Sequence, residues 1–312
     1  MILFEPLLQW FSIHARECPW RTPIRLVYPT LVSEMMSQQT VLPVVIPKFQ
    51  SFMKTFPTMD HLAEASLESV YEAWAGLGYY RRARNLKKAC EECATIEIPR
   101  DYEGWLKKPG CGEYTSAMIA SLCFKEKVLA MDGNVTRVLA RVFAFENVWG
   151  QGRLKQLKRF GEEAFLNFPT DIPGTLNEAM IELGALVCKP QNPACNICPL
   201  SNQCKSYQKG LLDKIPGVKP RKKKIEVELW CPVPETKEGL TNKRPFLKEH
   251  VGFPLLTEAP ILVGYQFLGT VKHTITHHNL KIHVYKFKEG KTQIDHIFQT
   301  SLDQKIAKIS YT

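Results

Sequence analysis

Residues 188–204 read CKPQNPACNICPLSNQC, a stretch that places four cysteines within seventeen positions. Their spacing, C-x6-C-x2-C-x5-C, belongs to Cys188, Cys195, Cys198 and Cys204. Structural zinc sites more often pair two C-x2-C turns across a longer gap, so the asymmetric spacing favours an iron–sulfur centre over zinc. The alternative is four ordinary buried cysteines, but the other six are scattered without any such grouping. The stretch therefore predicts one metal centre.

The composition sets broad limits on the kind of protein. A length of 312 residues allows about two domains with a substantial core. The 41 Lys and Arg against 31 Asp and Glu give a formal net charge of +10, which suits a polyanionic partner without establishing one. Residues 1–20 predict an amphipathic helix and neither a signal peptide nor a membrane span. Ten cysteines without export indicate a reducing compartment.

The pattern from residue 1 to 205 is helical. Val135, Val138, Leu139 and Val142 recur at helical spacing and predict one apolar stripe on a helix. Glycine- and proline-containing turns separate similar stripes from one another. These further stripes run through 3–16, 43–55, 66–75, 80–94, 115–124, 152–168 and 174–187. We therefore expect a mainly α region over 1–205.

The composition changes after residue 205. Residues 206–224 are basic and punctuated by glycine and proline, which predicts a surface linker, and five of the six residues 219–224 are basic. Three segments rich in Val, Ile, Tyr and Phe then predict strands at 225–231, 261–268 and 280–287. We expect a smaller β-containing domain over 225–312.

Two short polar segments are candidates for chemistry. KPGCGEYT (108–115) joins two predicted helices through Gly110 and Gly112, and the free amides of the helix that follows suit a phosphate. The alternative is a simple helix–helix turn. DGNV (132–135) places Asp132 at the start of the next helix, where it could serve only as the N-cap. The residue types alone leave both alternatives open.

The order of these features resembles the helix–hairpin–helix DNA glycosylases that hold a [4Fe–4S] cluster, and among them the adenine-specific MutY-type enzymes. The resemblance covers roughly residues 3–210 and implies a mainly α fold, with a six-helix and a cluster-bearing subdomain and a hairpin at about 105–124. It implies a smaller α+β C-terminal domain that resembles a reduced Nudix-like domain. The matching segments are PWR (19–21), SEMMSQQT (33–40), GLGYYRRARNL (76–86), DGNV (132–135) and NEAMIELGA (177–185).

The resemblance implies base excision repair, in which adenine paired with 8-oxoguanine or guanine in double-stranded DNA is removed and an abasic site remains. Hydrolysis of that bond needs an acid for the departing base and a negative charge near the developing sugar cation. By position, Glu34 resembles the acid and Asp132 the carboxylate beside the sugar. The apolar neighbours of Glu34 favour a raised pKa; a surface carboxylate is the alternative.

The resemblance assigns further residues around these two carboxylates. Tyr114 stands where bifunctional relatives have a lysine nucleophile, which implies a monofunctional enzyme because a phenol forms no imine. Asn134 resembles a partner that orients Asp132. Arg21 and Glu178 resemble residues of the adenine pocket.

Other residues match positions that contact the opposing base. Gln39, Thr40 and Tyr79 resemble groups that enter the duplex and lower the cost of base extrusion, although core packing is the alternative for Tyr79. In the C-terminal domain, Thr276 and His277 resemble part of an element that recognises 8-oxoguanine. Ile275 replaces its aromatic residue, which weakens that inference.

The resemblance also implies a [4Fe–4S] cluster held by the four cysteines of 188–204. It implies a monomer that works on DNA in a bacterial-type cytoplasm, near the nucleoid, or in another reducing compartment. Two other functions remain open. One is a related glycosylase for mismatched thymine or oxidised pyrimidines; the other is an inactive DNA-binding module, against which the presence of both carboxylates argues.

Overall fold

The computed structural model describes residues 3–218, 223–241, 253–258, 264–275, 278–287 and 301–310. The chain divides into two compact units, Met1–Lys219 and Pro220–Thr312. Thr276, His277 and residues 219–222 of the basic run lie outside the described residues.

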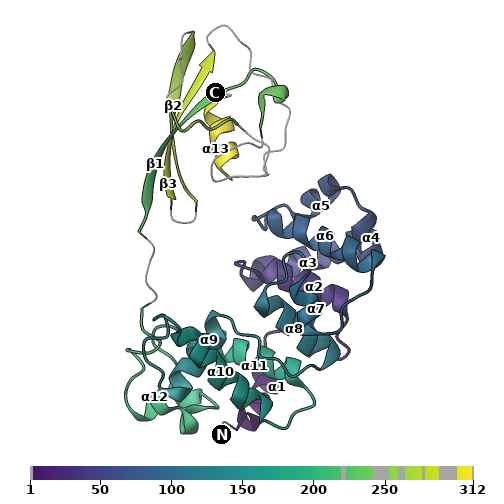
Figure 1. Ribbon diagram of the computed structural model, residues 1–312, viewed down its shortest axis with the longest axis vertical. Helices are drawn as coiled ribbons and strands as arrows, with labels where there is room; N and C mark the ends of the chain where they lie inside the picture. Colours follow the sequence, from purple (N-terminus) through teal and green to yellow (C-terminus); the bar gives the residue numbers. More distant parts are fainter. Residues whose placement is uncertain are drawn as a thin grey trace. The chain divides into compact units, whose positions relative to one another are not determined.

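The first unit is helical, as the apolar stripes predict (Figure 1). Two short 3-10 turns, at Cys195–Ile197 and Ser201–Gln203, lie in the cysteine loop. The α-helices are α1 (Glu5–His14), α2 (Val27–Ser37), α3 (Leu42–Thr55), α4 (Met59–Glu64), α5 (Leu67–Trp74), α6 (Arg81–Thr95), α7 (Tyr102–Leu106), α8 (Glu113–Phe124), α9 (Gly133–Phe143), α10 (Arg153–Leu166), α11 (Pro173–Leu186) and α12 (Lys205–Gln208).

Two large apolar cores organise these helices. One contains Trp74 and Trp105 and is built from α2–α8, together with the segments between them. The other is built from α1, α9, α10 and α11, so the N-terminal helix packs with elements that follow it by more than a hundred residues. The segment between α1 and α2 therefore crosses from one core to the other.

The sequence of α9 explains its boundaries and orientation. Its buried side chains Val135, Val138, Leu139 and Val142 form the predicted stripe. The Asp132 side chain caps the helix by accepting the Val135 N–H at 2.7 Å. The apolar stripe thus fixes which face of α9 packs on α11, and the cap fixes where the helix begins.

Residues 206–218 do not form the predicted linker. They belong to the first unit and pack against its core. Ile215 is 1% exposed and belongs to the core around α9. The Arg141 guanidinium donates to the carbonyl of Ile215 at 3.0 Å, and the Trp149 indole donates to the carbonyl of Gly217 at 3.2 Å. The prediction of a linker rested on the basic composition of this segment. It missed the few apolar residues, such as Ile215, that pack in the core.

The second unit contains a three-stranded sheet in the order β1-β3-β2. Strand β1 (Ile225–Val233) is parallel to β3 (His278–Phe287), whereas β2 (Tyr265–Ile275) is antiparallel to it. A 3-10 turn (Lys237–Gly239) follows β1, and α13 (Ser301–Ser310) packs its buried residues into the core of the sheet. Residues 261–263 of the expected strand at 261–268 lie outside the described residues; β2 continues beyond that strand to Ile275, with a register shift between Phe267 and Gly269.

No helix within the described residues is both long and apolar enough to cross a membrane.

The close approach of α8 and α11 depends on Gly174. A Cβ at that position would lie 2.5 Å from the Leu122 Cα. We expect Gly174→Ala to destabilise the protein by about 1–3 kcal/mol in urea unfolding, since the backbone of α8 must move. Gly133→Ala is the control, because its Cβ would meet nothing within 4 Å. Equal stability of the two variants would contradict this packing account.

Candidate active site

Glu34 is a carboxyl group buried on α2. The residue is 9% exposed. Burial raises the pKa of the Glu34 carboxyl to about 8; the charges of Glu178 and Asp132 add to the rise, while a hydrogen bond with Tyr114 and the charge of Arg21 oppose it. Glu34 is therefore protonated at neutral pH, as a general acid requires.

Tyr114 lies in the first turn of α8, next to Glu34. Burial raises the pKa of the Tyr114 phenol well above its ordinary value, and the nearby Glu34 and Asp132 carboxylates reinforce this effect. The phenol therefore stays neutral and shares a hydrogen bond with Glu34. This contact joins α8 to α2 at Glu34.

Asp132 is the N-cap of α9, and each of its carboxylate oxygens has its own partner. One oxygen, Oδ1, caps α9 through the Val135 N–H, and the other, Oδ2, accepts from Asn134 Nδ2 at 2.9 Å. These two hydrogen bonds fix the orientation of the carboxylate. The structure thus brings the Glu34, Tyr114, Asp132 and Asn134 of the sequence prediction into one place.

Arg137 extends this arrangement to the cysteine loop, and sequence reasoning missed it. Its Nη2 donates to Asn134 Oδ1 at 2.8 Å, and its Nε donates to the Cys188 carbonyl at 2.7 Å. Gly184 allows α11 to approach, because a Cβ there would lie 2.5 Å from the Asn134 Cβ. The position of Arg137 three residues after Asn134 was a signal in the sequence, since residues spaced i, i+3 lie on the same helix face.

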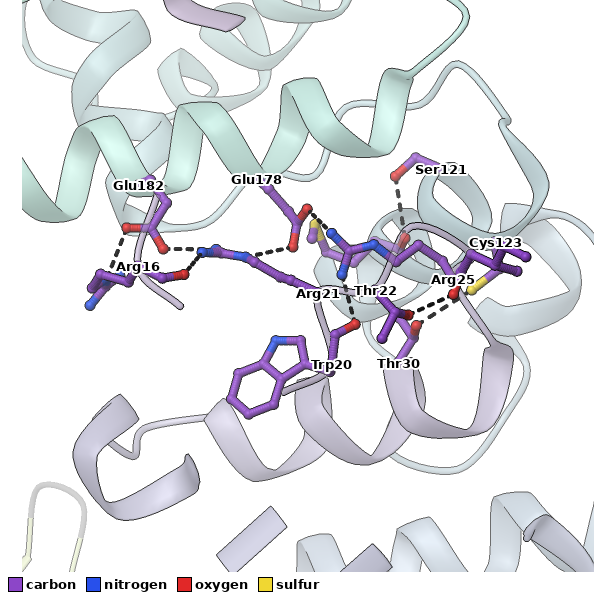
Figure 2. Close-up of polar contacts among 12 residues, drawn as sticks. Arg16, Trp20, Arg21, Thr22, Arg25, Thr30, Ser121, Cys123, Glu178 and Glu182 are labelled. Carbon is purple, nitrogen blue, oxygen red and sulfur yellow. Dashed lines mark hydrogen bonds and ion pairs between the residues drawn. The ribbon is translucent and has the colours of Figure 1, made fainter. Parts of the chain in front are cut away.

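Arg21 and Glu178 meet in an ion pair between the α1–α2 segment and α11, drawn in Figure 2. Arg21 Nε lies 3.0 Å from Glu178 Oε1, and Arg25 Nη2 lies 2.7 Å from Glu178 Oε2. Arg21 also reaches Glu182 at 2.7 Å, and Arg16 pairs with the same carboxylate. The buried negative charges of α11 are thereby compensated by three arginines.

Arg82 forms hydrogen bonds with both segments that are predicted to face the opposing base. Sequence reasoning missed this residue as well. Its guanidinium donates to the Met36 carbonyl at 2.8 Å, to the Leu77 carbonyl at 2.9 Å and to Thr40 Oγ1 at 3.1 Å. Tyr79 is 65% exposed with φ of 48°, so it projects outward and is not part of the core. Gln39 is likewise exposed, with φ of 57°.

The glycine hairpin connects α7 to α8. Gly110 has φ of 80°, and a Cβ there would lie 2.7 Å from the Met35 Cε, so the turn requires glycine. Gly112 is exposed and is the N-cap of α8, without a side-chain cap. Lys108 precedes this turn; its Nζ lies 3.6 Å from Glu92 Oε2, and its side chain is largely buried.

The four loop cysteines line one cavity with apolar walls from α9, α11 and the loop itself. The Arg141 Nη1 donates to Cys188 Sγ at 3.4 Å and to the Lys189 carbonyl at 2.7 Å. Within the described ranges, no group of three or more His, Cys, Asp or Glu side chains is placed to hold one metal ion. Four thiols that line one cavity are the donor set that iron–sulfur clusters use.

Residues 32–159 match the family described as the HhH-GPD superfamily of base excision DNA repair proteins. An adenine DNA glycosylase of Schizosaccharomyces pombe is 39% identical over 227 residues, which are 65% of this chain and 49% of that protein. The adenine DNA glycosylase of Mycolicibacterium smegmatis is 35% identical over 204 residues, which are 63% of this chain and 67% of that protein. This chain belongs to the adenine DNA glycosylase family.

The family assignment agrees with the fold of the first unit. A thermostable thymine-DNA glycosylase matches with a TM-score of 0.57 at 23% identity, over 65% of this chain and 94% of that one. At this identity the likeness concerns the fold alone. The chain spans about half to two thirds of the length of the first curated relatives.

The buried Glu34 makes stability depend on pH. In the unfolded chain the carboxyl ionises near its ordinary pKa of 4.5, whereas the folded state retains the proton to about 8. Stability should therefore fall as pH rises from about 4.5 to about 8. We expect Glu34→Gln to be more stable than the parent at pH 8.5, on the order of a few kcal/mol, with a smaller difference at pH 5.

Thermal melting at several pH values measures this difference. Glu97→Gln, at an exposed position, is the matched control and should show no such trend. A Glu34→Gln difference that stays constant across this range would mean that Glu34 is ionised in the folded protein.

Proposed function

We propose that this chain is a monofunctional adenine DNA glycosylase that removes adenine paired with 8-oxoguanine or guanine in double-stranded DNA. The observation that supports this most directly is the pairing of a protonated, buried carboxyl at Glu34 with an oriented carboxylate at Asp132. A proton donor and a carboxylate match the two charges that develop in the reaction. The family of the chain supports the choice of adenine.

The chemistry follows from this arrangement. Glu34 donates its proton to the departing base, because neutral adenine is a poor leaving group. Asp132 stabilises the positive charge that grows on the sugar; its two hydrogen bonds hold the carboxylate in place during this step. Water then completes hydrolysis and leaves an abasic site.

Tyr114 supports hydrolysis without strand cleavage. A phenol cannot form the imine that a lysine nucleophile forms with the opened sugar. The hydrogen bond between Tyr114 and Glu34 instead orients the acid. The enzyme should therefore leave the strand intact until alkali is added.

The loop cysteines support a resident [4Fe–4S] cluster, held by Cys188, Cys195, Cys198 and Cys204. The cluster would supply a fixed centre around which the loop folds. Arg137 then connects that loop to Asn134 and so to Asp132. For 8-oxoguanine recognition, Thr276 and His277 remain sequence candidates only.

The test is incubation of the purified chain with labelled duplexes containing A opposite 8-oxoguanine, A opposite G, T opposite G, or an oxidised pyrimidine. Release of adenine, with strand breakage only after alkali, is the expected result. Cleavage of the thymine or pyrimidine duplex instead would reject the adenine assignment. Borohydride should trap no covalent adduct under conditions where a lysine-type glycosylase is trapped.

Asp132→Asn should lower the excision rate about a hundredfold or more, since the charge opposite the sugar is lost. Asparagine still caps α9, so the fold and DNA binding should persist. Asp101→Asn is a matched control, because Asp101 caps α7 in the same way, with its Oδ1 2.7 Å from the Gly104 nitrogen. Parent-like turnover by Asp132→Asn would leave Asp132 as a helix cap only.

Protein purified without oxygen should contain about four irons per chain and absorb as a brown iron–sulfur protein. Cys198→Ser should lower the iron content. Cys123→Ser, outside the loop, should not. Stoichiometric zinc with little iron in the parent protein would contradict the cluster assignment.

A further inference from the structure

Arg25 lies immediately before α2, and neither the predicted site nor the mechanism above uses it. Figure 2 shows its guanidinium directed at Glu178 of α11. Its Nη1 donates to the Trp20 carbonyl at 2.8 Å, and its side chain is 15% exposed. Both contacts hold the guanidinium in one orientation against the carboxylate.

Glu178 therefore has a separate arginine for each oxygen. Oε1 accepts from Arg21 Nε at 3.0 Å, and Oε2 accepts from Arg25 Nη2 at 2.7 Å. The Glu178 side chain is only 5% exposed, so water cannot replace either partner readily. Removal of Arg25 would leave one buried carboxylate oxygen without its donor.

The position of Glu178 matters because its charge acts on Glu34. The charged and titratable groups that face Glu34 come from four elements. They are Arg21 from the segment before α2, Tyr114 and Cys123 from α8, Asp132 at the start of α9 and Glu178 from α11. Among the carboxylates of this set, Glu178 has the largest effect on Glu34.

We propose that Arg25 is a positioning residue for adenine excision: by holding Oε2 of Glu178, it fixes that carboxylate beside Glu34 and offsets part of its charge. This inference rests on the proposed function. Arg25 does not touch the reacting atoms. It acts through Glu178, and its loss should change how the acid titrates and how well the base is held.

The direction of the change follows from electrostatics. Without Arg25, the negative charge of Glu178 is less compensated, and a stronger negative charge disfavours ionisation of Glu34. Glu34 then keeps its proton to higher pH. The decrease in excision rate on the alkaline side should therefore occur at higher pH. The rate on the plateau should drop, because Glu178 can rotate and the base is held less precisely.

The experiment is single-turnover excision from the A opposite G duplex across roughly pH 6–9.5, with thermal melting of each variant. For Arg25→Met we expect about a tenfold lower plateau rate. The alkaline limb of the pH–rate profile, where the rate decreases, should shift to higher pH by roughly half a unit or more. Arg25→Lys keeps the positive charge, so its limb should stay near that of the parent. Arg16→Met is the matched control, because it removes an arginine that pairs with Glu182 and not with Glu178.

Each outcome decides one question. The inference would be overturned if Arg25→Met leaves the alkaline limb at the pH of the parent and lowers the rate no more than Arg16→Met does. Arg25 would then form only a structural ion pair. A limb shifted equally by Arg25→Lys and Arg25→Met would also overturn it, since charge would not be the cause. If the parent protein releases no adenine from any duplex, the proposed function itself fails.

Discussion

The burial of negative charge between two helical cores is the constraint on which the candidate site depends. Three carboxyl groups meet there, and the protein compensates each one differently. Glu34 retains its proton, Asp132 is stabilised by the start of α9 and by Asn134, and Glu178 is held by two arginines. A buried carboxylate without such a partner would cost several kcal/mol.

The different surroundings of these carboxyl groups give them different chemical properties. A carboxyl group placed against apolar residues and near like charges keeps its proton and can act as an acid. A carboxylate at a helix N-terminus is held by free backbone N–H groups and can face a positive charge. The two cores therefore provide both an acid and a carboxylate from side chains with the same chemistry.

Arginine joins the segments that create this environment. Arg82 binds carbonyls at the end of α2 and in the segment before α6, Arg137 binds Asn134 and the cysteine loop, and Arg21 binds two carboxylates of α11. A guanidinium has five donors in a fixed plane, so one side chain can fix several backbone segments at once. Part of the positive charge that suggested a polyanionic partner is thus used inside the protein.

The sequence alone determined the helical class, the stripe of α9 and the cysteine loop, and the resemblance to a family supplied the candidates Glu34, Tyr114, Asp132 and Asn134. These depend on local periodicity and on short motifs whose residues are near one another in the chain. The cap of α9 was also readable, because Asp132 and Val135 are three positions apart.

Tertiary structure decided the contacts of Arg25, Arg82 and Arg137, since each binds a partner that lies far away in the sequence. It also decided that residues 206–218 pack on the first unit, because a few buried side chains such as Ile215 outweigh a basic composition. The raised pKa of Glu34 has the same origin, because it results from the burial of one carboxyl among groups contributed by four separate segments. Local pattern specifies which residues are available, and packing over long sequence distances sets their charge states.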